Sequence, residues 1–73
     1  MSGAAIELDR LRLVLLEAGW EQTSSGRWRL NAWRLETAYV WGEVTVTVRL
    51  TEQGVPVAEY RGMDPVSWVA EQI

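Results

Sequence analysis

The alternation of apolar and polar residues between Arg27 and Leu50 constrains the fold of this chain more than any other feature. Successive side chains of a β-strand point to opposite faces of its sheet, so a period of two predicts a half-buried strand. The second half of the stretch places apolar residues on one face and polar residues on the other: Val44, Val46, Val48 and Leu50 against Glu43, Thr45, Thr47 and Arg49. Its valines also favour strand structure. We therefore expect an antiparallel sheet centred on this stretch.

The first half of the stretch changes phase near Asn31 and Ala32. Apolar residues stand at even positions before this point and at odd positions after it: Trp28 and Leu30, then Trp33, Leu35, Tyr39 and Trp41. A bulge or tight bend at Asn31 would return both sets to one face. We expect Gly42 and Glu43 to mark the reversal into the valine strand. Trp28, Trp33 and Trp41 are then structural, on the face that packs against a helix.

Helical spacing predicts an N-terminal helix from Ala5 to Ala18, after a flexible tail at residues 1–4. Its main apolar stripe consists of Leu8, Leu11, Val14, Leu15 and Ala18, and Gly19 follows as the cap. Three further apolar residues lie on a second side: Ile6, Leu13 and Leu16. A helix that is apolar on two sides is either sandwiched within its own fold, the interpretation that we favour, or shared with a partner.

Turn residues divide the remaining chain into short elements. A strand is expected at residues 20–23, and another at residues 55–60, where Pro56 indicates an edge position or a strand start. Asp64 and Pro65 are typical of a helix opening. The apolar face of this last helix consists of Val66, Val69, Ala70 and Ile73. Trp68 lies nearly opposite that face, so we expect its indole either near solvent, available to a partner, or covering the sheet edge.

These elements predict an α+β fold in a single domain at residues 5–73. An N-terminal helix precedes a three- to four-stranded antiparallel sheet, and a short helix closes the chain. At 73 residues the domain is near the lower limit for a core without covalent staples. Tryptophan compensates, because each aromatic side chain can bury ~150–250 Å².

Composition argues against catalysis and metal binding. The chain contains neither cysteine nor histidine, so thiolate ligands and the commonest general base are absent. The ten acidic residues are spread singly, without a recognisable pair. We therefore expect no enzyme activity, no cofactor and no metal. No apolar run approaches a membrane span, and the first residues lack a basic leader, so we expect a cytoplasmic protein without membrane contact.

Charge is segregated along the chain, although its formal total is −3. Residues 22–35 contain Arg27, Arg29 and Arg34 and no acidic residue. On the solvent face of the sheet these arginines could contact phosphates, with neighbouring aromatics stacking on bases. The alternative, which we favour, is a solvated sheet face with arginine stems covering tryptophan edges.

The segment from Leu11 to Leu30 joins a leucine-rich helix to the pair Gly19-Trp20 and the turn Ser25-Gly26-Arg27. It resembles the opening of HicA-type mRNA interferase toxins, in which a Gly-aromatic pair precedes a turn with Gly-Ser-His. The resemblance implies the helix–three strands–helix arrangement of double-stranded RNA-binding folds. The catalytic histidine of that family is missing here, which argues against its RNase activity.

These features are compatible with three alternative functions. The first is a small acidic, non-catalytic protein-binding module, a stoichiometric inhibitor similar in size and composition to the anti-CRISPR and anti-restriction proteins of phages and mobile elements. The second is weak nucleic-acid binding by Arg27, Arg29 and Arg34. The third is a small structural or regulatory homodimer. For a protein partner or self-association, the candidate residues are Ile6, Leu13, Leu16 and Trp68.

Overall fold

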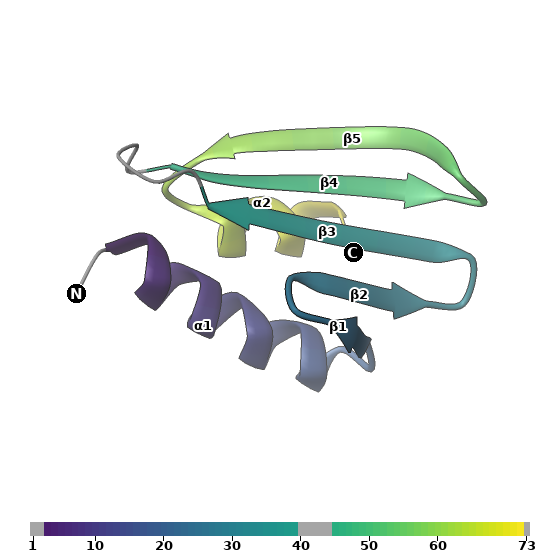
Figure 1. Ribbon diagram of the computed structural model, residues 1–73, viewed down its shortest axis with the longest axis horizontal. Helices are drawn as coiled ribbons and strands as arrows, with labels where there is room; N and C mark the ends of the chain where they lie inside the picture. The colour runs from purple at the N-terminus through teal and green to yellow at the C-terminus, as the bar shows by residue number, and fades with distance from the viewer. Residues whose placement is uncertain (1–2, 40–44, 73) are drawn as a thin grey trace.

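The computed structural model describes residues 3–39 and 45–72, with side chains from Ala5 onward. Within these ranges a helix, five strands and a second helix follow one another along the chain (Figure 1). The elements are α1 (Gly3–Glu17), β1 (Glu21–Ser24), β2 (Arg27–Leu30), β3 (Trp33–Tyr39), β4 (Val46–Glu52), β5 (Val55–Gly62) and α2 (Pro65–Gln72). The α+β class is confirmed, but the expectation of three to four strands is wrong. The three-stranded arrangement implied by the HicA resemblance is likewise not the arrangement found.

The strands form one antiparallel meander in the order β1-β2-β3-β4-β5. The extra strand comes from the phase break at Asn31 and Ala32, which is a two-residue hairpin turn rather than a bulge within one strand. Asn31 adopts a φ of 54°, a conformation that asparagine tolerates better than most residues. The reversal pairs Trp28 with Leu35 and Leu30 with Trp33, so both apolar sets share one face, as the alternation predicts.

Both helices pack on that same face of the sheet. Leu11 and Leu15 of α1 and Val69 of α2 belong to one buried cluster with residues of β2, β3 and β4 and with the residue that precedes β1. The other members of the cluster are Trp20, Trp28, Leu35, Val46, Val48 and Leu50. The valine strand is confirmed for its described members, while Trp41, Gly42, Glu43 and Val44 lie outside the described residues. The protein is thus a two-layer domain with one covered and one open sheet face (Figure 1).

The N-terminal helix begins at Gly3, two residues earlier than predicted, so residues 3 and 4 are helical rather than part of a tail. It ends at Glu17, one residue before the predicted Ala18, and Gly19, whose φ is +94°, follows as the predicted cap. The Gly19 amide donates to the carbonyl of Leu16 (3.2 Å) and the Trp20 amide to that of Leu15 (2.9 Å). These two bonds form a Schellman motif, which satisfies carbonyls at the helix end and turns Trp20 into the core.

The second helix begins where the Asp64-Pro65 pair predicts. The Ser67 amide donates to Oδ1 of Asp64 at 3.3 Å, which is the expected N-cap bond. Val69 is buried, whereas Ala70, assigned to the same apolar face, is exposed, and Ile73 lies outside the described residues. Of the two alternatives for Trp68, the second is the one found: its half-buried indole packs on the core cluster and stacks on Tyr60 of the edge strand β5, rather than standing near solvent.

The two edges of the sheet are both irregular. β5 is an edge strand that contains Pro56, as predicted, and its pairing with β4 shifts register between Leu50 and Thr51. The opposite edge, β1, has four residues and shifts register between Gln22 and Ser24. Short, bulged or proline-containing edges resist the addition of another strand. Neither helix is long and apolar enough to cross a membrane in the described part of the chain.

Candidate interaction surfaces

The outer face of α1, defined here by Ile6, Leu13 and Leu16, points away from the sheet. These side chains are 45%, 55% and 47% exposed, respectively. The interpretation of a sandwiched helix is therefore wrong. The sheet lies on the other side of α1, where Leu11 and Leu15 are buried, and α2 packs beside α1 without covering its outer face.

Charged residues of both signs border this apolar outer face. Arg10 pairs with Glu7 at 3.0 Å and Arg12 pairs with Asp9 at 3.5 Å, each along the helix. Because these exposed pairs contribute little to stability, their side chains can exchange partners at low cost. Trp68 is not part of this surface, since its indole stacks on Tyr60 of the edge strand β5. The structure thus brings together three of the four residues proposed for partner binding.

The open face of the sheet, opposite both helices, carries Arg27, Arg29 and Arg34. All three are exposed and alternate with the buried Trp28 and Leu35, as the strand period predicts. The register also places arginines of β4 and β5 on this face. Arg49 of β4 is the cross-strand neighbour of Glu36, and Arg61 of β5 is the cross-strand neighbour of Thr47. The sequence alone did not assign these two residues, since their grouping depends on strand order.

The open face is positive although the chain as a whole is acidic. Five of the seven arginines lie there with three glutamates, Glu21, Glu36 and Glu59, which leaves this face at +2. The formal charge of the entire chain is −3. Folding of the sheet therefore places on one face five arginine side chains that are spread between residues 27 and 61 in the sequence.

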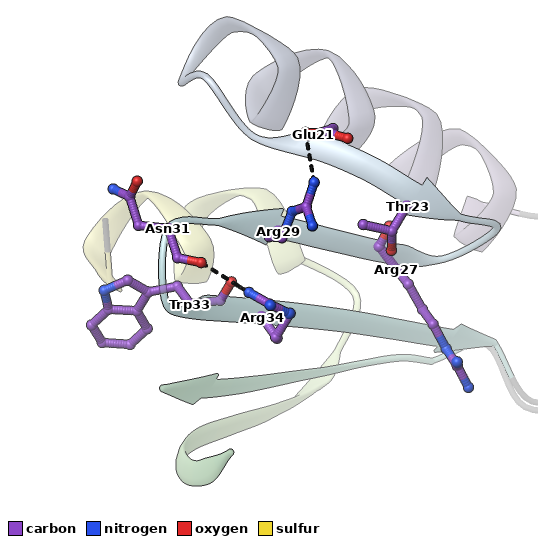
Figure 2. A network of polar contacts seen from close by, with 7 residues as sticks. All are labelled: Glu21, Thr23, Arg27, Arg29, Asn31, Trp33 and Arg34. Carbon is purple, nitrogen blue, oxygen red and sulfur yellow. Dashed lines mark hydrogen bonds and ion pairs between the residues drawn. The ribbon is translucent and has the colours of Figure 1, made fainter. Parts of the chain in front are cut away.

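The arginines of the open face differ in how they are neutralised. Arg29 pairs with Glu21 at 3.0 Å, and Arg49 pairs with Glu59 at 3.4 Å. Arg34 instead donates through Nη1 to the backbone carbonyls of Asn31 (2.9 Å) and Trp33 (3.0 Å), as Figure 2 shows.

The guanidinium of Arg27 extends away from β1 and has neither an ion pair nor a hydrogen bond within the described chain (Figure 2). Its backbone carbonyl alone accepts a bond, from Oγ1 of Thr23 at 3.3 Å. Arg27 and Arg34 therefore have no carboxylate partner within the described chain, whereas Arg29 and Arg49 each lie beside one.

A hollow of about 330 Å³ lies between these two arginines. Its polar lining consists of Thr23, Arg27, Arg34, Glu36 and Thr51. Trp28 and Trp33 belong to the helix-covered side, opposite the arginines as predicted, so the described part of the open face carries no aromatic side chain. The face can offer guanidinium and hydroxyl donors to an anion, but it offers no described aromatic ring on which a base could stack.

The described residues contain no group of three or more acidic side chains placed to hold a metal ion. On the helix-covered side of the sheet, the buried indole nitrogen Nε1 of Trp20 has no hydrogen-bond partner among the described residues. Trp20 lines a cavity of about 220 Å³ with Leu30, Trp33, Leu50 and Gln72.

The geometry defines a small two-layer α+β domain with an apolar helix surface and a basic sheet surface. No protein-family model, curated protein or solved structure matches the chain.

Proposed function

We propose that this protein is a non-catalytic binding module that acts by occupying the surface of another protein. The observation that carries the proposal is the exposure of Ile6, Leu13 and Leu16, each about half accessible, on the side of α1 opposite the core. Large aliphatic side chains grouped on one exposed helix face are typical of protein interfaces. The interface is the outer face of α1, and its occupant is an α-helix of the partner.

The spacing of the outer face supports a helical partner. Ile6, Asp9, Leu13 and Leu16 follow the three-four-three spacing of the a and d positions in a heptad repeat. Such a stripe forms the seam along which a second helix packs at a shallow angle. Asp9 interrupts the apolar stripe, and a partner with a cation opposite Asp9 would therefore be selected over one that is apolar throughout.

The size of the outer face supports a modest affinity. Burying an aliphatic side chain completely is worth about 1.5–3 kcal/mol, so three half-exposed residues supply about 2–4 kcal/mol in total. A micromolar complex requires about 8 kcal/mol after association costs. The charged border of the outer face, or further contacts by the partner, must supply the difference. A permanent homodimer built on this face alone is disfavoured for the same reason.

Strand addition at the sheet edges is a less favourable mode of binding. Pro56 and the irregular register of β5 interrupt the row of backbone donors that an added strand would use. β1 is too short to pair with more than a few residues. The helix surface therefore supports protein binding better than either edge.

The test uses a pair of matched substitutions. Leu13→Glu places a charge at the centre of the outer face, while Val57→Glu makes the same chemical change at a residue of similar exposure (51%) on β5. A photo-crosslinking residue at position 13 or 57 then reports which surface meets another polypeptide, with crosslinked peptides identified by mass spectrometry. We expect crosslinks from position 13 to a helical segment of a partner.

With the photo-crosslinking residue placed instead at position 16 of the same outer face, Leu13→Glu should remove the crosslinked complex and leave the far-ultraviolet circular dichroism unchanged, whereas Val57→Glu should affect neither. Sedimentation velocity of the pure protein shows whether the partner is a second copy. Unfolding of Leu13→Glu would assign Leu13 to the core and contradict the proposal. Equal crosslinking from both positions would also contradict it.

A further inference from the structure

We propose that the hollow between Arg27 and Arg34 on the open face binds a backbone phosphate of a nucleic-acid strand. This surface is separate from the outer face of α1, which lies beyond the other side of the sheet. The hollow has about 330 Å³ of space, enough for a phosphate group with its solvent. Three of its polar residues can donate to an anion, two as guanidinium groups and one as a hydroxyl: Arg27, Arg34 and Thr51.

The first argument is the state of the two arginines. Arg27 has no ionic partner within the described chain, although Glu36 is its direct cross-strand neighbour. Arg34 is held by neutral carbonyl oxygens only, and these bonds leave its charge uncompensated. The two residues stand diagonally on β2 and β3 and both line the hollow. Because both side chains are exposed, their guanidinium groups can turn from the directions seen in Figure 2 toward a single anion bound there.

The second argument is a like-charge contact in the strand register. Arg29 and Arg34 are direct cross-strand partners, an arrangement that destabilises a sheet. The structure separates the two guanidinium groups, sending Arg29 toward Glu21 and Arg34 toward the turn carbonyls (Figure 2). A bound anion would offset the repulsion that this register creates.

The third argument selects the class of anion. Because the whole chain carries −3, an isolated acidic group is repelled at long range. A nucleic-acid strand overcomes this repulsion, since each phosphate that is neutralised releases condensed counterions. Guanidinium groups also match the geometry of phosphate oxygens in paired contacts. Without an aromatic ring on the described open face, binding should depend on the backbone and ignore base identity.

The hollow also contains one group that opposes an anion. Glu36 lines it, and its carboxylate repels a phosphate at short distance. The affinity is therefore modest and falls as the salt concentration rises. One phosphate contact to a single strand predicts a slope of about −0.7 for log K against log salt concentration.

The test titrates each variant into fluorescently labelled oligothymidylate at low salt and follows the anisotropy. Arg27→Gln and Arg34→Gln should each weaken binding about tenfold, the effect of one charge-assisted contact. Arg49→Gln is the matched control on the same face, because Arg49 is paired with Glu59 and lies outside the hollow. It should change the affinity by less than about twofold. Glu36→Gln should strengthen binding about threefold.

Three results would overturn the proposal. The first is absence of oligothymidylate binding by the wild-type protein at low salt. The second is an Arg49→Gln loss as large as that of Arg27→Gln, which would indicate a diffuse field rather than a site. The third is displacement of the oligonucleotide by polyglutamate as effectively as by unlabelled DNA, which would identify an acidic protein surface as the ligand. Circular dichroism of every variant confirms that these exposed substitutions leave the fold intact.

Discussion

The rings of Tyr60 and Trp68 stack with centroids 5.6 Å apart and planes inclined by 27°. Tyr60 also accepts a hydrogen bond at its hydroxyl from the backbone amide of Asp64, at 2.7 Å. One side chain of the edge strand β5 therefore contacts α2 at two points, at its N-cap and within its first turns. This contact explains why Trp68 packs against the sheet instead of facing solvent.

A double-mutant cycle measures this contact. We expect Tyr60→Ala and Trp68→Ala each to lower the free energy of unfolding, with a coupling energy of about 0.5–1.5 kcal/mol between them, the range found for aromatic pairs. Urea unfolding followed by far-ultraviolet circular dichroism provides the four free energies. Additive effects would show that the two rings do not support each other in solution.

Gly62 is expected to be sensitive to the smallest side chain, because Tyr60 passes over it. A Cβ atom at Gly62 would lie 2.5 Å from the Tyr60 hydroxyl oxygen and 2.9 Å from Cζ of the same ring. Gly62→Ala should displace the ring and cost about 1–3 kcal/mol of unfolding free energy. In the Tyr60→Phe background the hydroxyl is absent, and the penalty of Gly62→Ala should shrink. An equal penalty in both backgrounds would contradict this account.

Gly26 and Gly54 form a matched pair for testing steric crowding at a turn. Both have positive φ, +73° and +80°, so alanine strains the backbone at either position. Only at Gly26 does the new Cβ collide, 2.9 Å from the Thr37 carbonyl oxygen, whereas Gly54 has nothing within 4 Å. We expect Gly54→Ala to cost about 1 kcal/mol and Gly26→Ala about 1–3 kcal/mol more. Similar unfolding free energies for the two variants would rule out the crowding.

Two tryptophans of the alternating stretch are expected to differ in their importance for folding. Trp28 is 4% exposed in the core cluster, while Trp33 is only half-buried beside it. Trp28→Ala should cost about 3–5 kcal/mol, comparable with the stability of a domain this small, and leave the protein unfolded. Trp33→Ala should remain folded with a lower midpoint in urea. If Trp28→Ala retains native circular dichroism, the core tolerates the cavity and the prediction fails.

The sequence by itself determined the local features of this protein. The valine alternation identified the inner face of β4, Gly19 identified the end of α1, and Asp64-Pro65 identified the start of α2. These features are set by neighbouring residues, through the strand period, the left-handed conformation of glycine and the capping of free amides. The side of β2 and β3 on which the arginines lie also followed from the strand period.

Only the tertiary structure decided how these elements combine. A change of phase near Asn31 is compatible with a bulge or a hairpin, and the choice depends on whether β2 can pair with β3 and cover the core beneath it. The exposure of Leu13 and Leu16 depends on which side of α1 the sheet occupies, and the burial of Trp68 depends on Tyr60, eight residues earlier. The basic open face arises because strand order and register bring Arg49 of β4 and Arg61 of β5 onto the same face as the arginines of β2 and β3, a long-range relationship that no local pattern of residues encodes.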